Sequence, residues 1–507
     1  MTRTVSFLLT ATLLGSSLLA QKGVPAAPTT PFWPGYGRDP AHNANADVLS
    51  QPLQRILWQT PVDLQPQYTG TVLYMHYASP LITRGHLVLV TVKTGVNGDF
   101  QVEARHPATG ALQWTETTDW VQPPHNWGMP CGSTLTPDNK LATPAAGGTI
   151  LLRANADQPN SSVTRLAFYG LTAYQQNQAL YDADVAISTP ITSDAQGNLY
   201  FGYQVASGSA VPMSSGIARI SSTGVGTYVA ASTAAGSTQI RKVVYNCAPA
   251  LANGSLYVAV NSSNSSGGSW GYLLKLDPTT LAQQARIRQK DVANPNADAL
   301  LLDDGTASPT VGPDGDVYFG VFENQYGANH YRGWMRHFDA NLAVTKIAGP
   351  FGWDDTASIV PRHMVPQYTG TSQYLLLTKY NNYGGGAGGN GQNKLGVFDP
   401  NATMVDPVTG ATVMNVVLEM VGPTPDPTIP GGVREWCINT AAVDVRGKSA
   451  IVNCEDGKCY RWHFPTNTLS ETITLTAGIG EAYTPTILGP TGISYAMNDA
   501  KLYALGK

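Results

Sequence analysis

This chain of 507 residues contains little charge and no long apolar run after its N-terminal region. Charged residues make up only 13% of the sequence, and the formal net charge is −4. Because there is no basic stripe or patch, we expect no nucleic-acid partner. Beyond the N-terminus no stretch approaches the roughly 20 consecutive apolar residues that a membrane helix needs, so we also expect no transmembrane segment.

Several motifs of catalysis and cofactor binding are also missing. The sequence has no G-x-S-x-G elbow for a nucleophilic serine. It has no P-loop, and no G-x-G-x-x-G placed between a strand and a helix. It has no C-x-x-C-H for a covalent c-type haem. Serine hydrolysis, nucleotide binding and covalent haem therefore have no support in the sequence.

The N-terminus carries a targeting pattern. Arg3 precedes the apolar run Val5–Ala20, which is too short and too early for a structural span and predicts a secretory signal peptide over residues 1–20. There is no cysteine at the expected cleavage site, so a lipoprotein anchor is not expected. We therefore expect a periplasmic or extracellular protein. Residues 21–50, rich in Pro, Ala and Asn, are predicted to form an irregular N-terminal arm.

Cysteine is scarce, with five residues in the chain. This number fits an oxidising compartment. Cys454 and Cys459 flank a short turn between two strand-like runs, which predicts a disulfide across a tight hairpin; the alternative is two free thiols. Cys131, Cys247 and Cys437 remain unassigned, and the odd count leaves at least one thiol free.

Turn formers and short apolar runs are abundant instead. The chain contains 52 glycines and 35 prolines, and no sustained helical periodicity follows the N-terminus, so we predict an all-β protein. One stretch shows the unit of construction. It contains four short apolar runs in about 40 residues, with a Gly-Pro-Asp-Gly turn between the first two, and this is typical of a four-stranded propeller blade. The four runs are Ala307–Val311, Val317–Val321, Trp334–Phe338 and Leu342–Ile347.

The same pattern recurs along the chain. Each unit opens with a triplet that contains small residues and leads into a short strand, because innermost strands crowd around a propeller axis where large side chains would collide. The second strands are rich in Val, Tyr, Phe and Leu, as expected for strands buried on both faces. Eight units are found, and they open at Ala78–Pro80, Cys131–Ser133, Ser188–Pro190, Cys247–Pro249, Ala307–Pro309, Thr356–Ser358, Ile438–Thr440 and Tyr483–Pro485.

The two ends of the repeat array are complementary. The last unit has room for only three strands before Lys507, whereas residues 53–62 form an isolated strand-like run without a hairpin partner. Pairing this run with the C-terminal blade would close the ring and remove its exposed edges. We therefore predict an eight-bladed β-propeller as a single domain over residues 51–507. Seven or nine blades remain open, because the unit at residues 356–420 is long and irregular.

One segment connects this pattern to a known family. Residues 104–114, ARHPATGALQW, resemble the tryptophan-docking motif A-x-D-x-x-T-G-x-x-x-W of the pyrroloquinoline-quinone (PQQ)-like propellers, with His106 in place of the usual Asp. In that family the Thr-Gly turn joins the two outer strands, and the Trp packs against the neighbouring blade. Weaker copies lie at Leu274–Thr280, Arg336–Leu342 and Val397–Thr403.

The resemblance implies two alternative functions. The family includes non-catalytic assembly scaffolds, and it suggests a secreted or periplasmic scaffold that binds a protein, peptide or glycan on its loop-rich central face. It also includes PQQ- and calcium-dependent dehydrogenases that oxidise alcohols or sugars. Those enzymes usually carry two adjacent cysteines over the quinone, and this chain has no adjacent pair. We therefore favour the binding function, with Ca²⁺ as a possible cofactor ahead of PQQ.

The loops that lead into the innermost strands supply the first set of candidate site residues. If the chain were an enzyme, Asp304 or Asp355 would be the best candidate for its catalytic base. Several acids around a narrow axis repel one another, and a bound Ca²⁺ would relieve this repulsion. Alternatively, these residues only cap strand ends and face water. The metal candidates are Asp304, Asp355, Glu435 and Glu481, and the ligand-binding candidates are Trp127, Trp353, Arg434 and Trp436.

The loops between the second and third strands supply the other candidates. Residues 323–334 are rich in Tyr, Trp, Asn and Arg, which suit stacking on and hydrogen bonding to a sugar or peptide; the alternative is a solvated spacer. The ligand-binding candidates in this loop are Asn329, His330, Arg332 and Trp334. Together the two sets of loops predict a binding site on one face of the propeller.

Overall fold

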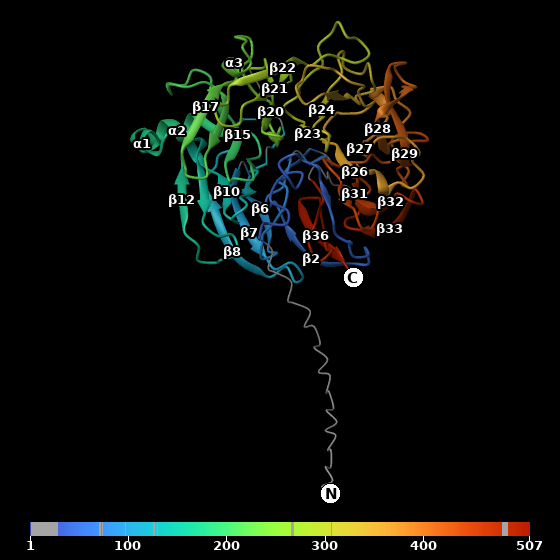
Figure 1. The fold of residues 1–507 in the computed structure, drawn as a ribbon, viewed down its shortest axis with the longest axis horizontal. Coiled ribbons are helices and arrows are strands. Elements are labelled where there is room, and N and C mark those ends of the chain that lie inside the picture. Colours follow the sequence, from blue (N-terminus) through green and yellow to red (C-terminus); the bar gives the residue numbers. More distant parts are fainter. Residues whose placement is uncertain are drawn as a thin grey trace.

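Eight sheets stand like blades around a central axis in the computed structural model (Figure 1). The structure describes Met1 and residues 29–507, apart from 70, 71, 74, 97, 125, 126, 129, 265–267, 306 and 479–484. The predicted signal peptide over residues 1–20 lies outside the described residues. The sheets are antiparallel within each blade, which confirms the predicted all-β propeller with eight blades.

The strands of the first four blades follow one another along the chain. Blade 1 consists of β5 (Leu81–Ile82), β6 (Val88–Gly95), β7 (Gly98–Arg105) and β8 (Leu112–Thr118). Blade 2 consists of β9 (Thr134–Leu135), β10 (Leu141–Pro144), β11 (Ile150–Arg153) and β12 (Val163–Leu166). Blade 3 consists of β13 (Val185–Ile187), β14 (Thr192–Ser193), β15 (Leu199–Val205), β16 (Gly216–Ile220) and β17 (Gly226–Ala230). Blade 4 consists of β18 (Lys242–Val243), β19 (Ala250–Ala252), β20 (Ser255–Asn261), β21 (Gly271–Leu276) and β22 (Gln283–Arg288).

The last four blades complete the circle. Blade 5 consists of β23 (Thr310–Val311), β24 (Val317–Val321) and β25 (Trp334–Phe338). Blade 6 consists of β26 (Ser358–Pro361), β27 (Tyr374–Lys379), β28 (Lys394–Val405) and β29 (Thr412–Val421). Blade 7 consists of β30 (Ala442–Asp444), β31 (Ser449–Cys454), β32 (Lys458–His463) and β33 (Thr468–Thr474). Blade 8 consists of β34 (Ile487–Leu488), β35 (Ser494–Asn498), β36 (Lys501–Gly506) and, from the other end of the chain, β2 (Arg55–Pro61).

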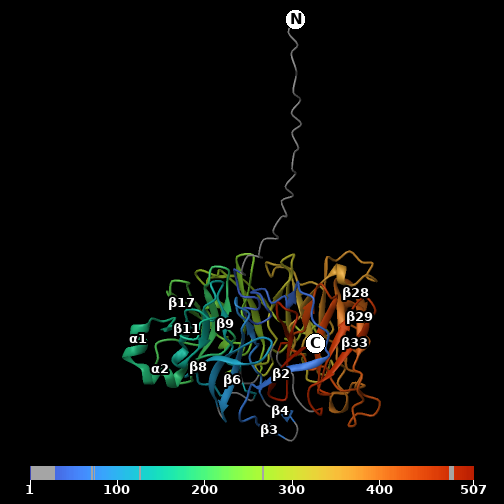
Figure 2. The same cartoon turned by 90° about the horizontal axis from the view of Figure 1, so that it is seen from below.

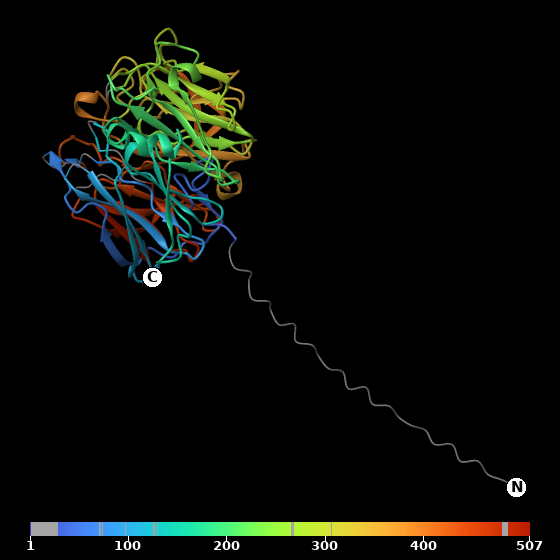
Figure 3. The same ribbon diagram turned by 90° about the vertical axis from the view of Figure 1, so that its left-hand side faces the viewer.

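Helices are few and short. Helices α1 (Leu171–Gln176) and α2 (Gln178–Asp184) lie on the outer rim of the ring between blades 2 and 3 (Figures 1 and 3). A third, α3 (Ala231–Ala234), and the 3₁₀ turns η1 (Ala146–Gly148), η2 (Arg362–Met364) and η3 (Gly385–Ala387) lie in connections. In the part of the chain that the structure describes, no helix has both the length and the apolar character needed to cross a membrane.

The ring closes through its two ends, as predicted. Strand β2 runs antiparallel to β36, with Gln59 opposite Tyr503 and Thr60 opposite Leu502. The strand spans Arg55–Pro61, within the predicted range of residues 53–62. This pairing removes one free edge from the last blade, which would otherwise be open to another chain.

Close packing at the axis explains the small residues of the innermost strands. A Cβ atom built on Gly132 would lie only 2.7 Å from the Cα atom of Pro190 in the next blade. A Cβ atom built on Gly202 of β15 would lie 2.8 Å from side-chain atoms of both Thr189 and Val243. Real side chains do not approach so closely, and larger residues here would push the blades apart.

The segment before β2 runs along the inside of the ring, where we expected an irregular arm. Its residues 32–51 form main-chain hydrogen bonds to seven of the eight blades, and we call this segment the strap. Its carbonyl oxygens accept from innermost strands, as Pro34 does from Leu135 (2.7 Å) and Pro40 does from Leu251 (2.7 Å). The other bonds join the strap to Ile82, Val311, Ile359, Val443, Val445 and Gly492. A short parallel pair, β1 (Asn45–Ala46) with β30, is the only regular strand pairing of the described strap.

The tryptophan-docking motif behaves as the resemblance implies. Trp114 is buried, and its indole N–H donates to the carbonyl of Ala156 in blade 2 at 3.0 Å. The guanidinium of Arg153, also in blade 2, lies 4.0 Å from the centre of its ring. Gly110 adopts a left-handed φ of +69°, and a Cβ there would lie 2.7 Å from the ring of Trp58. The motif therefore ties blade 1 to blade 2 on one side and to blade 8 on the other.

Two predicted elements need correction. In blade 5 the run Leu342–Ile347 is not a regular fourth strand. Leu342 has a φ of +55° and closes a turn back to Asp339, so pairing is limited to the bridges Phe338–Thr345 and Met335–Gly349. In blade 6 the segment Val397–Thr403 lies within the bulged strand β28. The turn of the docking type is Asp406–Gly410 instead, where Asp406 accepts from the Thr409 hydroxyl at 2.8 Å.

The predicted disulfide between Cys454 and Cys459 is wrong, because both residues are buried free thiols. In the β31–β32 ladder Cys454 lies opposite Lys458, whereas Cys459 lies opposite Asn453. Paired residues share a face and neighbours along a strand alternate, so the two thiols point to opposite faces of blade 7. Cys454 packs in the interface with blade 6, and Cys459 packs in the interface with blade 8.

The strap gives a direct stability prediction. Trp33 is completely buried between the strap and blade 1. Its replacement by Ala should lower the free energy of unfolding by about 3–5 kcal/mol, because a large cavity would remain near the axis. Urea unfolding of the purified chain measures this change. The control is Leu49→Ala in the same strap, because Leu49 is 64% exposed and its removal should leave stability almost unchanged. Equal effects of the two substitutions would contradict the structural role of the strap.

Candidate ligand-binding face

One end of the ring gathers the loops that carry the predicted site residues. These loops lead from the outer strand of one blade to the inner strand of the next, or connect the second and third strands of one blade. The small hairpin β3 (Tyr68–Thr69) with β4 (Val72–Leu73) belongs to the same end, and it points downward in Figure 2. We call this end the top face.

A cluster of buried charges lies around the axis of the top face. Lys379 of β27 is 2% exposed, and its ammonium lies 3.8 Å from a carboxylate oxygen of Asp354. The backbone N–H of Lys379 donates to Asp355 at 2.8 Å. Burial opposes the charge of Lys379, but Asp354, Asp355 and Glu435 nearby raise its pKa above the usual value. Burial raises the pKa of Asp355 and of Glu435, which Lys379 partly offsets.

His76 joins this cluster from blade 1. Its Nδ1 atom lies 3.3 Å from the amide nitrogen of Asn246, and its ring stacks on Trp127 with ring centres 5.4 Å apart. Burial lowers the pKa of His76 to about 4, so the imidazole is neutral at pH 7. His76 therefore contributes packing against Trp127 at the central opening of the top face and no charge. His125, which could have joined it in a metal site, lies outside the described residues.

Calcium and the quinone are the two groups that the axial residues were expected to hold. Among the described residues, no three His, Cys, Asp or Glu side chains converge as metal ligands, so Asp304, Asp355 and Glu435 form no metal site by themselves. Glu481 lies outside the described residues. Below His76 the described residues enclose an axial cavity of about 20 Å³, bordered by Tyr36 of the strap. This volume suits one water molecule, whereas a tricyclic quinone needs a pocket of about 300 Å³ or more. This cavity is therefore too small for the quinone, and the described acids do not gather as calcium ligands.

The remaining candidates of the first loop set are dispersed. Asp304 is half-buried, and burial together with the nearby Asp354 raises its pKa. Trp436 is fully buried and packs on Tyr460 of blade 7, so it offers no surface to a ligand. Arg434 is half-buried on the outer part of blade 6, with its guanidinium 3.9 Å from Asp426. These residues share a face but do not form one site.

The loop 323–334 is largely packed inward, and its predicted ligand-binding residues contact other parts of the fold. Arg332 is 1% exposed, and its guanidinium lies 2.7 Å from Asp406 in blade 6. Trp334 is completely buried in β25 and donates to Asp291 at 3.1 Å. Asn329 is buried and donates to Gly333, and His330 lies 2.7 Å from Asn382 of the neighbouring loop. These residues hold the loop in place.

The exposed part of the same loop is aromatic, and its tyrosines were not among the ligand-binding residues predicted from the sequence. Tyr326 is 62% exposed and Tyr331 is 36% exposed. Both pack on Phe322, with ring centres at 4.9 Å and 5.9 Å, and Phe322 also contacts the edge of Trp353 at 5.0 Å. We call these four residues the aromatic platform. Of them, only Trp353 was among the predicted ligand-binding residues.

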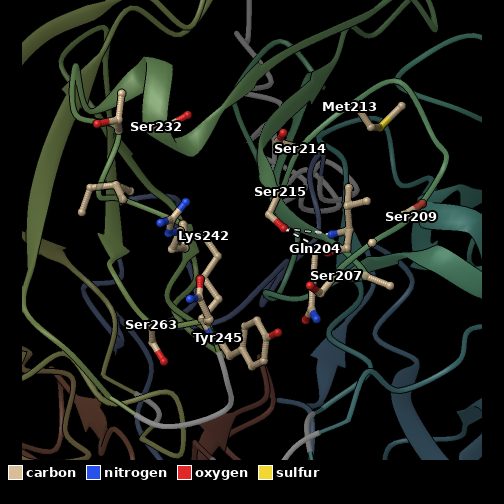
Figure 4. A pocket seen from close by; sticks show the side chains of 17 residues that line it. Gln204, Ser207, Ser209, Met213, Ser214, Ser215, Ser232, Lys242, Tyr245 and Ser263 are labelled. Carbon is tan, nitrogen blue, oxygen red and sulfur yellow. Dashed lines mark hydrogen bonds between the residues drawn. The ribbon is translucent and has the colours of Figure 1, made fainter.

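A larger pocket lies between blades 3 and 4, and sequence reasoning did not find it (Figure 4). Its volume is about 480 Å³. One wall is the β15–β16 loop of blade 3, and the others come from residues 232–245 and from the β20–β21 loop. Most of its labelled side chains carry hydroxyl or amide groups, as Figure 4 shows for Gln204, Ser207, Ser209, Ser214, Ser215, Ser232 and Ser263.

A buried ion pair forms the floor of this pocket. The ammonium of Lys242 lies 2.5 Å from a carboxylate oxygen of Asp303, and both residues are almost fully buried. Asp303 also accepts from the N–H of Tyr245 at 3.1 Å and from Asn261 at 3.2 Å, while Lys242 lies 3.8 Å from the centre of the Tyr245 ring. Burial raises the pKa of Asp303 to about 7 and lowers the pKa of Lys242, and each charge partly offsets the shift of the other.

Comparison with known proteins establishes the fold class. No family model and no curated protein matches the chain. A europium-containing methanol dehydrogenase shares 10% sequence identity with it, and the match covers 92% of this chain and 89% of that chain with a TM-score of 0.56. Quinohemoprotein alcohol dehydrogenase from Comamonas testosteroni shares 10% sequence identity, and the match covers 95% of this chain and 82% of that chain with a TM-score of 0.43. Saccharomyces cerevisiae Sqt1 shares 11% identity, and the match covers 90% of this chain and 99% of that chain with a TM-score of 0.49.

The first of these matches confirms the expected likeness in fold. The chain has the eight-bladed propeller arrangement of a quinoprotein dehydrogenase. At 10% identity the likeness extends to the fold alone, because one fold supports many activities. The functional conclusion therefore depends on the side chains of the top face.

The ion pair at the pocket floor gives a second stability prediction. Asp303→Asn should cost about 3–5 kcal/mol in the free energy of unfolding, because it leaves the ammonium of Lys242 buried without its counter-charge. The double substitution Asp303→Asn with Lys242→Met should recover most of this loss, since no uncompensated charge remains. Urea unfolding measures both. Asp47→Asn, in an exposed pair with Arg446, is the control and should leave stability unchanged. A double variant no more stable than Asp303→Asn would contradict this account.

Proposed function

We propose that the chain is a non-catalytic binding protein whose top face holds a glycan. The observation that carries this proposal is the pocket of about 480 Å³ between blades 3 and 4, whose walls present mainly hydroxyl and amide groups. Its size falls within the range of small-molecule sites, and such groups exchange hydrogen bonds readily with sugar hydroxyls. The rigid blades hold these loops in fixed positions, which limits the entropy lost on binding.

The aromatic platform favours a glycan as the ligand, rather than an ion or a small metabolite. Tyr326 and Tyr331 present exposed rings from blade 5, and their hydroxyl groups add donors and acceptors. The β20–β21 loop of blade 4 lies between the pocket and blade 5, where Ser269 pairs with Leu301. A ligand of several sugar units would contact the polar pocket at one end and the platform at the other.

The alternative function, oxidation of alcohols or sugars with PQQ and calcium, has weaker support. The chain has no adjacent cysteines, and its described acids do not converge as a metal site. Asp355 is completely buried, and its raised pKa reflects burial next to Lys379 rather than contact with an open cleft. Asp355 is therefore better explained as a member of the axial charge cluster. We keep the proposed location of the protein as periplasmic or extracellular, on the pattern of residues 1–20.

A glycan array with the purified chain tests the proposal. Tyr326→Ala combined with Tyr331→Ala should weaken binding of any captured glycan about tenfold, because two aromatic contacts of about 0.7 kcal/mol each are lost. Tyr228→Ala is the matched control, since Tyr228 is 44% exposed on β17, away from the platform. An array without specific binding, or capture of peptides in place of glycans, would overturn the proposal.

A further inference from the structure

The pocket between blades 3 and 4 has an uneven charge. Two cationic residues, Arg241 and Lys242, line it, and none of its lining residues is Asp or Glu. The chain as a whole has a formal net charge of −4, so a purely cationic lining is not the average character of its surface. A pocket lined by charge of one sign raises the local concentration of ligands with the opposite charge.

The two cations have different roles. Lys242 is 5% exposed, and its ammonium forms an ion pair with Asp303. Arg241 is exposed, and its side chain forms no ion pair with a described residue. Its main-chain N–H is held by the carbonyl of Asn261 at 2.9 Å, which fixes its place at the start of β18. The guanidinium of Arg241 is therefore the positive group that a ligand meets.

Asp303 and Asp184, which lie next to lining residues of the pocket, have hydrogen-bond donors of their own. Asp303 is engaged by Lys242, by the N–H of Tyr245 and by Asn261. Asp184, behind the β15–β16 loop, accepts from the hydroxyl of Ser209 at 2.5 Å. Both carboxylates therefore have donors of their own, and the pocket keeps the positive charge of Arg241.

Hydroxyl groups line the same pocket as Arg241. Ser207, Ser214 and Ser232 form no side-chain hydrogen bond with another described residue. They are available to donate to or accept from a ligand. Arginine binds a carboxylate through two parallel N–H···O bonds, and serines bind neighbouring sugar hydroxyls.

We propose that this pocket selects an acidic glycan, with a sugar carboxylate on Arg241 and the sugar hydroxyls on the serines of the β15–β16 loop. This inference rests on the proposed glycan-binding function and names its ligand class. The aromatic platform contributes to affinity for acidic and neutral glycans alike. The charge of Arg241 contributes only to the affinity for acidic glycans. The difference in affinity between acidic and neutral glycans therefore measures the contribution of the pocket.

Matched pairs of sugars test the inference. The probes are fragments of polygalacturonate, polymannuronate and hyaluronan, each measured by titration calorimetry beside its carboxyl-reduced, neutral counterpart. At least one acidic fragment should bind about tenfold or more tightly than its neutral counterpart, because a charge-assisted hydrogen bond is lost on reduction. Arg241→Gln should abolish that preference and leave the affinity for the neutral sugar unchanged. The preference of the wild-type chain should also shrink in high salt.

The control and the contradicting outcomes separate the two proposals. Arg446→Gln removes an exposed arginine of blade 7 that is paired with Asp47, and it should leave the acid preference intact. Equal binding of the acidic and neutral fragments would overturn the acidic-glycan inference and leave glycan binding standing. An acid preference that survives Arg241→Gln would overturn the assignment to this pocket. Binding of no fragment, acidic or neutral, would overturn both proposals.

Discussion

The rest of the structure depends on the close approach of the innermost strands at the axis. Neighbouring blades meet there with a spacing that leaves no room for a side chain on Gly132. The strap then crosses this crowded region; its carbonyl groups accept main-chain hydrogen bonds from six blades, and the N–H of Gln51 donates to Gly492 of blade 8. Strand β2 joins blade 8 directly after the strap. The N-terminal part of the described chain therefore holds the ring together both from the inside and at its closing blade.

Burial sets the chemical character of the top face. Around the axis, Lys379 lies among the carboxyl groups of Asp354, Asp355 and Glu435, and burial raises the pKa of Asp355 and Glu435. His76 is neutral and stacks on Trp127. Away from the axis the charge is exposed. The pocket between blades 3 and 4 is open to solvent, and Arg241 forms no ion pair with a described residue. The binding face is thus displaced from the centre of the ring toward blades 3, 4 and 5.

The repeat architecture was predictable because its signals are local. Each triplet of small residues, each turn and each apolar second strand can be recognised within about 40 residues. The number of blades and the pairing of the two ends followed from counting such units. The strap was not predictable in this way, because its carbonyl groups, such as those of Pro34 and Pro40, carry no sequence signature. The error at Cys454 and Cys459 arose because spacing across a hairpin does not show on which face each thiol lies.

The site was less predictable than the fold, for a physical reason. Polar and aromatic residues in a long loop suggest a surface, but Trp334 and Arg332 find buried partners 43 and 74 residues away. The pocket is composed of loops from two blades, and its serines have the composition of ordinary solvated turns. Only the ring geometry brings them beside Arg241 and Lys242. Asp354, Asp355 and Glu435 lie near the buried Lys379, and nothing in the local sequence indicated that this lysine would be buried among them.

The central claim is that a rigid ring presents one binding face, and hydrogen exchange followed by mass spectrometry tests it most directly. The full chain is measured with and without a saturating acidic oligosaccharide. The account predicts added protection in residues 204–215, 238–245 and 322–332, with no change in the turns at Thr109–Gly110 and Thr409–Gly410 on the opposite side of the blades. Protection confined to those turns, or around the axial residues 352–356 alone, would contradict the account.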